Sequence, residues 1–212
     1  LNTSQASLLV HRLSERIKIH RDVEVVLAPS MLVLQPLSMQ IDRRKFRLAA
    51  QNAYYKDEGA FTGEVSFTML QDLVHYVIIG HSERRHVFGE NHRLIRDKVS
   101  ACVRNGITPI LCIGETKDER TAKETSRVLH DQLTSAVSDL TADEVSNMVI
   151  AYEPVWAIGT GKTATPEMAQ QVHNLIRTTL AKTSVDAADV VQILYGGSMK
   201  PDNAKDLLAM SD

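Results

Sequence analysis

Short apolar runs rich in β-branched residues alternate with longer segments of helical periodicity along the whole sequence. Six such runs occur, at residues 23–28, 46–50, 76–79, 108–113, 149–152 and 190–195. Several are nearly continuous in apolar residues, which is typical of strands buried on both faces. Alternation of such strands with helices predicts an α/β fold with a parallel sheet and crossover helices.

Two segments carry the clearest helical signals. In residues 91–105 the apolar side chains share one face, and Gly106 follows at a typical stop position. A second helix begins at Thr165-Pro166-Glu167, where a capping hydroxyl precedes a first-turn proline and an acidic residue that the helix dipole favours. We therefore predict helices over 91–105 and from 165 to 180.

Two architectures with a parallel sheet compete: an open doubly wound sheet and an eight-stranded (β/α)8 barrel. The first run is followed by Ala28-Pro29-Ser30 and not by the Gly-rich turn of a doubly wound nucleotide-binding fold. Polar residues follow several other runs, at Gln51-Asn52, His81, Glu153 and Gly196-Gly197-Ser198. A site assembled from many strand ends favours the barrel. No linker interrupts the chain, so we predict one barrel domain over 1–212, incomplete because six strands are fewer than eight.

Composition argues against several classes of function. The chain has 43% hydrophobic residues and a net charge of −2, so it can bury a core and has no basic surface for nucleic acid or membranes. No apolar run has the length of a transmembrane helix, and no charged-then-apolar leader opens the sequence. Cys102 and Cys112 are interpreted as small apolar fillers, which favours the cytoplasm.

The string AYEPVWAIGTGK at positions 151–162 places Glu153 at the end of a strand, before a loop of small residues. Pro154 and Trp156 form an ordered hinge, and Gly159 lets backbone N–H groups approach an anion. Glu153 alone is equally compatible with an ordinary ion pair. The whole string favours a catalytic carboxylate beneath a closing loop.

The end of the same string looks like part of a nucleotide-binding P-loop, because residues 159–163 read Gly-Thr-Gly-Lys-Thr. That motif needs a further glycine five positions before the glycine of the Gly-Lys pair. Trp156 occupies that position, so a nucleotide site is excluded.

A histidine follows the third apolar run within the string GHSERR at positions 80–85. At a helix N-terminus, His81 lies at the positive end of the dipole, which disfavours its cation. A neutral imidazole can donate to a carbonyl group and then exchange protons. The alternative is a histidine that only caps the helix.

Tyr195-Gly196-Gly197-Ser198 follows the last run. Paired glycines and a hydroxyl at such a turn suit phosphate binding through backbone donors. An ordinary tight turn is the alternative, with about equal weight.

Six motifs, in their family order, resemble the triosephosphate isomerase family: residues 51–52 (QN), 59–64 (GAFTGE), 80–85 (GHSERR), 111–115 (LCIGE), 152–162 (YEPVWAIGTGK) and 195–198 (YGGS). The resemblance implies a (β/α)8 TIM barrel that is normally a homodimer. It also implies interconversion of dihydroxyacetone phosphate and glyceraldehyde 3-phosphate by proton transfer through an enediolate, in glycolysis and gluconeogenesis. The only small-molecule partner implied is this triose phosphate, with no cofactor and no metal.

The resemblance also implies roles for individual residues. Glu153 removes a proton from the carbon next to the substrate carbonyl, His81 polarises that carbonyl, and Glu83 supports them. The residues that hold the phosphate are Gly159, Gly197 and Ser198. The lid residues are Pro154, Trp156, Ile158 and Lys162. The residues at the dimer interface are Asn52, Thr62 and Glu64. Cys112 packs beside the base, and Tyr195 contacts the closed lid.

The sequence departs from the family pattern at both ends. The family's first strand carries an Asn-x-Lys motif with a catalytic lysine, and none precedes Leu1; its eighth strand should follow Asp212. The runs present correspond to strands two to seven. Loss of the two missing strands would leave unpaired sheet edges, and loss of the lysine would lower the rate on the order of 10²–10³-fold.

Two explanations stay open for these departures. Either the molecule continues beyond this sequence, or it is truncated and a partner or a rearrangement fills the gap. An intact mass near 23.6 kDa would support truncation.

Three functions therefore compete: an isomerase, a non-catalytic barrel relative with a binding or structural role, and another phosphate-binding barrel enzyme. The third has no reason to keep the whole string at 151–162. A coupled isomerase assay, with Glu153→Gln as the inactive control, separates the first two.

Overall fold

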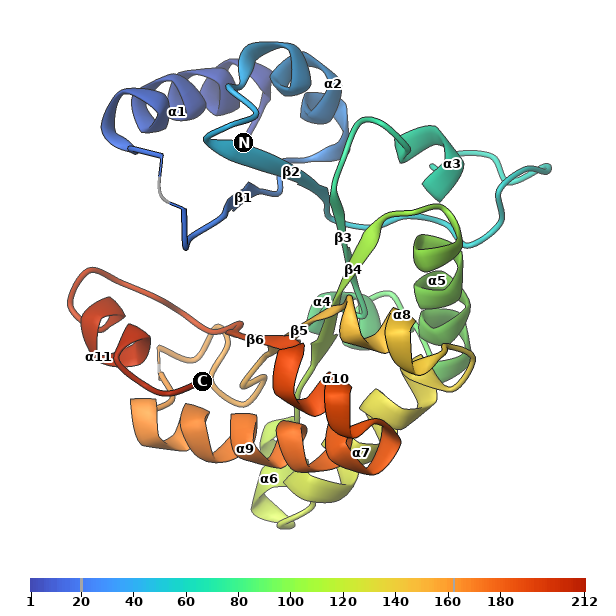
Figure 1. The fold of residues 1–212 in the computed structure, drawn as a ribbon, viewed down its shortest axis with the longest axis vertical. Coiled ribbons are helices and arrows are strands. Elements are labelled where there is room, and N and C mark those ends of the chain that lie inside the picture. Colours follow the sequence, from blue (N-terminus) through green and yellow to red (C-terminus); the bar gives the residue numbers. More distant parts are fainter. Residues whose placement is uncertain (20, 162) are drawn as a thin grey trace. The chain divides into compact units, whose positions relative to one another are not determined.

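The computed structural model describes residues 1–19, 21–161 and 163–212 (Figure 1). The chain divides into two compact units: the first contains residues 1–79 and 101–109, and the second contains residues 80–100 and 110–212.

The first unit carries short strands, with helices between them. Its elements are α1 (Thr3–Arg16), β1 (Val25–Leu27), α2 (Met31–Gln40), β2 (Phe46–Ala50), α3 (Phe67–Leu70) and β3 (Tyr76–Ile79). β1 pairs with β2 and β2 pairs with β3, both in parallel. A capping box between Asn2 and Gln5 starts α1, which packs against α2 (Figure 1).

α5 (His92–Arg104) and β4 (Thr108–Ile113) run from one unit to the other along the chain. The remaining elements belong to the second unit: α4 (Ser82–His86), α6 (Lys117–Thr121), α7 (Thr125–Val137), α8 (Ala142–Ser146), β5 (Val149–Tyr152), α9 (Pro166–Thr183), α10 (Val185–Val190), β6 (Gln192–Tyr195) and α11 (Ala204–Leu208). β4, β5 and β6 pair in chain order and in parallel. α9 packs against both α7 and α10 (Figure 1).

All six apolar runs contain a strand, as predicted. The four residues of β5 are all buried, in agreement with a strand covered on both faces. β6 begins only at Gln192, because residues 185–190 complete a helix that the sequence analysis did not predict. Within each unit, neighbouring strands are neighbours in the chain, without the reversal of order that defines a doubly wound sheet.

The two predicted helices are confirmed as α5 and α9. At the start of α9, the Thr165 hydroxyl accepts a hydrogen bond from the Met168 N–H, and Pro166 takes the first helical position. Within the described ranges, no helix combines the length and the apolar character that crossing a membrane requires.

Candidate active site

Glu153 directly follows β5 and lies in the interior of the second unit. Its backbone N–H donates to the Ile113 carbonyl at 2.8 Å, which continues the β4–β5 pairing by one residue. Its side chain is only 4% exposed. Burial of a carboxylate is costly unless both oxygens accept hydrogen bonds, so the hydrogen-bond donors around Glu153 determine how well its charge is stabilised.

Ser82 supplies two of these partners. The Ser82 N–H donates to Glu153 Oε2 at 2.8 Å, and its Oγ donates to Glu153 Oε1 at 3.2 Å. Ser82 is the first residue of α4, where an N–H group has no partner within the helix. The free N–H at this helix start is therefore used to hold the carboxylate.

His81 supplies the third partner. Its Nε2 lies 3.0 Å from Glu153 Oε1. Its Nδ1 accepts the Glu83 N–H at 3.3 Å, so the ring both caps α4 and contacts the carboxylate. An accepting Nδ1 assigns the proton of the neutral ring to Nε2, where it faces Glu153. The capping role and the catalytic role, set against each other in the sequence analysis, are thus compatible.

The charge state of His81 differs from the sequence-based expectation. The helix dipole was expected to disfavour the cation, yet the hydrogen bond to Glu153 raises the pKa of His81 above its ordinary value. Burial opposes this rise, and the charges of Glu153 and Glu83 add to it. The expectation was wrong because a carboxylate in direct contact outweighs the partial charge of a five-residue helix.

Gly114 explains how the chain reaches this geometry locally. A Cβ atom at this position would lie 1.8 Å from the Glu153 carbonyl oxygen, so only glycine lets the two backbones approach. Gln132 of α7 fixes the same peptide, because its side chain accepts the Gly114 N–H and donates to the Gly114 carbonyl. The end of β4 is therefore locked beside the proposed base.

Arg85 has a role that the sequence analysis did not assign, although it belongs to the GHSERR string. Its Nε donates to the Gly80 carbonyl at 2.7 Å, and its Nη2 donates to the Cys112 carbonyl at 2.8 Å. Burial lowers the pKa of Arg85, and the charge of Glu153 opposes this change. The guanidinium thus joins the residue before His81 to the end of β4. Only contacts between distant residues reveal this.

The loop after Glu153 consists of successive turns. The Ala157 N–H donates to the Pro154 carbonyl at 2.8 Å, and the Ile158 N–H donates to the Val155 carbonyl at 3.2 Å. Gly159 has a φ of 72°, a left-handed conformation that favours glycine. Pro154 is buried and Ile158 is exposed. The fourth expected lid residue, Lys162, lies outside the described residues.

The Trp156 hinge rests on a buried polar cluster. The Arg120 guanidinium lies 4.5 Å from the centre of the Trp156 ring and donates to Glu115 Oε1 at 2.7 Å. The Tyr152 hydroxyl donates to the same oxygen at 3.2 Å. The cation–π contact and the fully buried Glu115 hold the start of the loop against β5.

The other expected site residues differ in how far they are exposed to solvent. The Glu83 side chain is 72% exposed, with Oε2 3.9 Å from His81 Nδ1. Ser198 is exposed and its carbonyl accepts the Asn203 side chain at 3.1 Å. The ring of Tyr195 covers Gly197, where a Cβ would lie 2.3 Å from the Tyr hydroxyl. Cys112 is buried, and burial, followed by the charge of Glu153, raises the pKa of its thiol.

The three expected interface residues belong to the first unit. Asn52 is half-buried, whereas Thr62 and Glu64 are exposed on the loop after β2. This loop is closed by the Tyr54 N–H, which donates to the Val65 carbonyl at 2.8 Å. The structure therefore brings together His81, Ser82 and Glu153. The turn after β6 adjoins Glu153, because a Cβ at Gly196 would lie 3.1 Å from the Glu153 side chain.

Comparison with known proteins agrees with this arrangement. The sequence profile of the triosephosphate isomerase family matches residues 1–212. The triosephosphate isomerase of Geotalea uraniireducens is 47% identical over 212 residues, which cover 99% of this chain and 84% of the relative. That of Carboxydothermus hydrogenoformans is 46% identical over 98% of this chain and 84% of the relative, and that of Fusobacterium nucleatum is 45% identical over 100% and 85%. With its parallel strands and crossover helices, this chain has the α/β class of the TIM barrel, and it belongs to the triosephosphate isomerase family.

Proposed function

We propose that Glu153 is the base and His81 the electrophile of an isomerase acting on triose phosphates. Family membership makes the protein an isomerase of the glycolytic interconversion of dihydroxyacetone phosphate and glyceraldehyde 3-phosphate. The observation that supports these residue roles is the 3.0 Å contact between His81 Nε2 and the buried Glu153 carboxylate. A base and a proton donor that act on the carbon and the neighbouring carbonyl of one substrate must lie within hydrogen-bond distance of those atoms, and therefore close to each other.

In the free protein, both Glu153 oxygens are occupied by Ser82 and His81. A substrate carbonyl that accepts the His81 Nε2–H would displace the carboxylate from the ring. Glu153 then takes the proton from the neighbouring carbon, and the electron pair of that C–H bond forms the enediolate. The proton returns to the other carbon. Through His81, the former carbonyl oxygen gains a proton and the hydroxyl oxygen loses one, so no atom is gained or lost and both side chains are regenerated.

The loops after β5 and β6 supply the remaining parts of the proposed site. Gly159, Gly197 and Ser198 offer exposed or half-buried backbone in turns, which suits a phosphate group. Closure of the loop containing Pro154, Trp156 and Ile158 would exclude water from the enediolate. The negative charge of Glu83 would raise the pKa of the nearby His81 ring.

We also propose that the protein acts as a homodimer in the cytoplasm. The exposed loop carrying Thr62 and Glu64, with Asn52 at its start, supports the first proposal. The two cysteines in the described part of the chain, Cys102 and Cys112, are free and buried, which suits a reducing compartment. That the chain forms one domain stays a prediction. Light scattering with Thr62→Arg tests the dimer, since an unchanged mass would contradict this interface.

A coupled isomerase assay tests the catalytic roles. Glu153→Gln keeps the shape of the side chain but removes the base, so we expect the rate to fall at least about 10³-fold. Glu167→Gln is the matched control, because Glu167 is an exposed carboxylate of the same unit. Retention of turnover by Glu153→Gln would contradict the assignment, and an inactive wild-type protein would instead support a non-catalytic barrel relative.

A further inference from the structure

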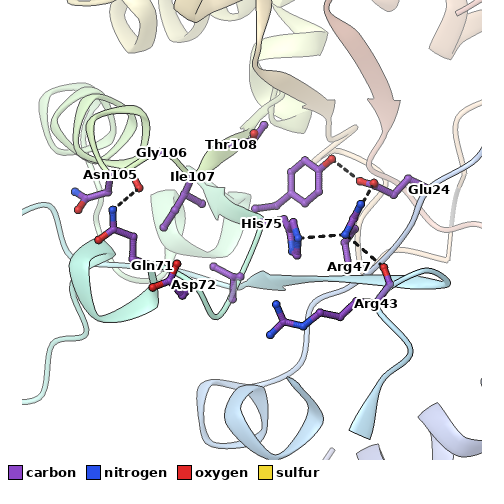
Figure 2. Close-up of a pocket in the computed structure, with 12 residues that line it drawn as sticks. Glu24, Arg43, Arg47, Gln71, Asp72, His75, Asn105, Gly106, Ile107 and Thr108 are labelled. Carbon is purple, nitrogen blue, oxygen red and sulfur yellow. Dashed lines mark hydrogen bonds and ion pairs between the residues drawn. The ribbon is translucent and has the colours of Figure 1, made fainter. Parts of the chain in front are cut away.

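The first unit contains an open cavity of about 680 Å³ at the starting ends of its strands. Glu24 precedes β1, Arg47 is the second residue of β2, His75 precedes β3 and Thr108 begins β4. Figure 2 shows these side chains along the walls of the cavity. The volume lies in the range of pockets that hold small metabolites.

Arg47 organises one wall. Its Nε donates to Glu24 Oε2 at 3.1 Å, and its Nη1 lies 3.3 Å from both the Arg43 carbonyl and His75 Nε2 (Figure 2). Tyr76 donates to the other oxygen of Glu24 at 2.5 Å. Both oxygens of Glu24 therefore already accept hydrogen bonds, one from Arg47 and the other from Tyr76, and the charge of Glu24 is paired with that of Arg47.

Two charged side chains of the cavity remain unpaired among the described residues. The Arg43 guanidinium makes no ion pair or side-chain hydrogen bond there, and Figure 2 draws no contact for it. The Asp72 side chain, on the wall formed with Gln71 and Asn105, likewise makes no ion pair or hydrogen bond within the described part of the chain. The Gln71 amide donates to the Asn105 carbonyl at 3.2 Å.

The two walls therefore need opposite chemistry from a ligand. Arg47 is paired with Glu24 through its Nε, but its Nη2 has no partner among the described residues. Together with the unpaired Arg43, it can donate to an acceptor with negative charge, such as the oxygens of a phosphate. The Asp72 carboxylate can accept hydrogen bonds from donors such as hydroxyl groups. The electrostatics agree, because burial and then the charges of Arg47 and Arg43 lower the pKa of His75.

We propose that this cavity binds a small phosphate ester that carries hydroxyl groups, with its phosphate between Arg43 and Arg47 and its hydroxyls toward Asp72. This site lies wholly within the first unit and is independent of the isomerase residues.

NMR titration of the His75 ring tests the proposal on the purified protein, with inorganic phosphate and glucose 6-phosphate as probes. A phosphate beside the two arginines offsets their charge, so the pKa of His75 should rise as either probe is added. Glucose 6-phosphate should bind more tightly than inorganic phosphate, and Asp72→Asn should remove that difference. A His75 resonance that neither probe moves would overturn the site.

Arg43→Gln should raise the dissociation constant of phosphate about tenfold, since a hydrogen bond to a charged group is lost. It removes no contact seen in the structure, so folding should be unaffected. Arg44→Gln is the matched control, because Arg44 binds Asp42 and does not line the cavity. Equal weakening by both variants would show a non-specific charge effect and reject the site, whereas loss confined to Arg43→Gln with unchanged isomerase turnover supports it.

Discussion

Two carboxylates of this protein are each held by two side chains, and their settings differ sharply. Glu153 accepts from Ser82 and His81, and its side chain is 4% exposed. Glu24 accepts from Arg47 and Tyr76, and its side chain is 44% exposed. Water can replace the partners of Glu24 but not those of Glu153. The buried carboxylate is therefore far more sensitive to its neighbours.

The partners also differ in what they can do. The arginine beside Glu24 keeps its proton at all relevant pH values, so that pair can only hold charge. The histidine beside Glu153 can gain or lose a proton near neutral pH. A buried carboxylate beside a titratable ring suits catalysis, whereas an open carboxylate beside an arginine suits structure or binding.

The largest effect should come from moving the buried carboxylate. Glu153→Asp withdraws it by one methylene, and a displacement of about 1 Å can lower the rate about 100-fold. Because the charge remains, KM should change little. Steady-state kinetics with the triose phosphate measures both constants, and equal losses in kcat and affinity would mean that Glu153 positions the substrate instead of abstracting the proton.

The second largest effect should come from Arg85, which holds the residue before His81 against the end of β4. Arg85→Met leaves the Gly80 and Cys112 carbonyls without their donor, so we expect the free energy of unfolding to fall by about 2 kcal/mol. As a positioning residue, Arg85 should affect kcat more than KM. Arg85→Lys should restore part of kcat, because an ammonium can satisfy one of the two carbonyls. Urea unfolding and kinetics check these outcomes, and an unchanged kcat in Arg85→Met would leave the residue a purely structural role.

The titration of His81 should show a smaller change. Because Glu153 raises the pKa of His81, Glu153→Gln should lower it, as measured by NMR of the ring. The pair stabilises the folded state below the unfolded histidine pKa of about 6.5, and this contribution is lost as pH rises through the higher folded pKa. Glu83→Gln is the control and should lower the pKa less, since Glu83 acts from 3.9 Å. An equal shift in both variants would show that contact with Glu153 is not the dominant cause.

The smallest effect should come from the open carboxylate. Burial raises the pKa of Glu24, but the hydrogen bonds from Tyr76 and Arg47 outweigh it, so the pKa is lowered overall. Its contribution is present at neutral pH and is lost as pH falls through that lowered value. Exposed pairs contribute about 0.2–1 kcal/mol, so Glu24→Gln should reduce the unfolding free energy by no more than this at pH 7. A larger loss, measured by urea unfolding, would mean that the cavity wall is more rigid than its exposure indicates.

The sequence predicted those features that depend on local pattern. The strands follow continuous apolar runs, and α9 follows from its cap and first-turn proline, because these signals act within a few residues. Glu153 and His81 were found because each lies in a distinctive string after a strand. The start of β6 was placed too early, because Val190 and Val191 continue the apolar run although α10 and its cap include them.

Other features depend on contacts between distant residues, which no local pattern encodes. The two bonds from Ser82 to Glu153 join residues 71 positions apart, and the role of Arg85 appears only when the Cys112 carbonyl is placed beside it. The raised pKa of His81 has the same origin. The cavity residues Arg43 and Asp72 look like ordinary surface charges until the strand starts bring them to one place.

The close approach at Gly114 has a consequence for how this protein can vary. In a library that samples every amino acid, position 114 should accept glycine alone, because a methyl group would meet the backbone of Glu153 at 1.8 Å. Gly89, unlike Gly114, has a left-handed backbone, but its missing Cβ would meet nothing within 4 Å, so asparagine or aspartate should be tolerated there. Selection for isomerase activity thus constrains a residue without a side chain as tightly as it constrains the base itself.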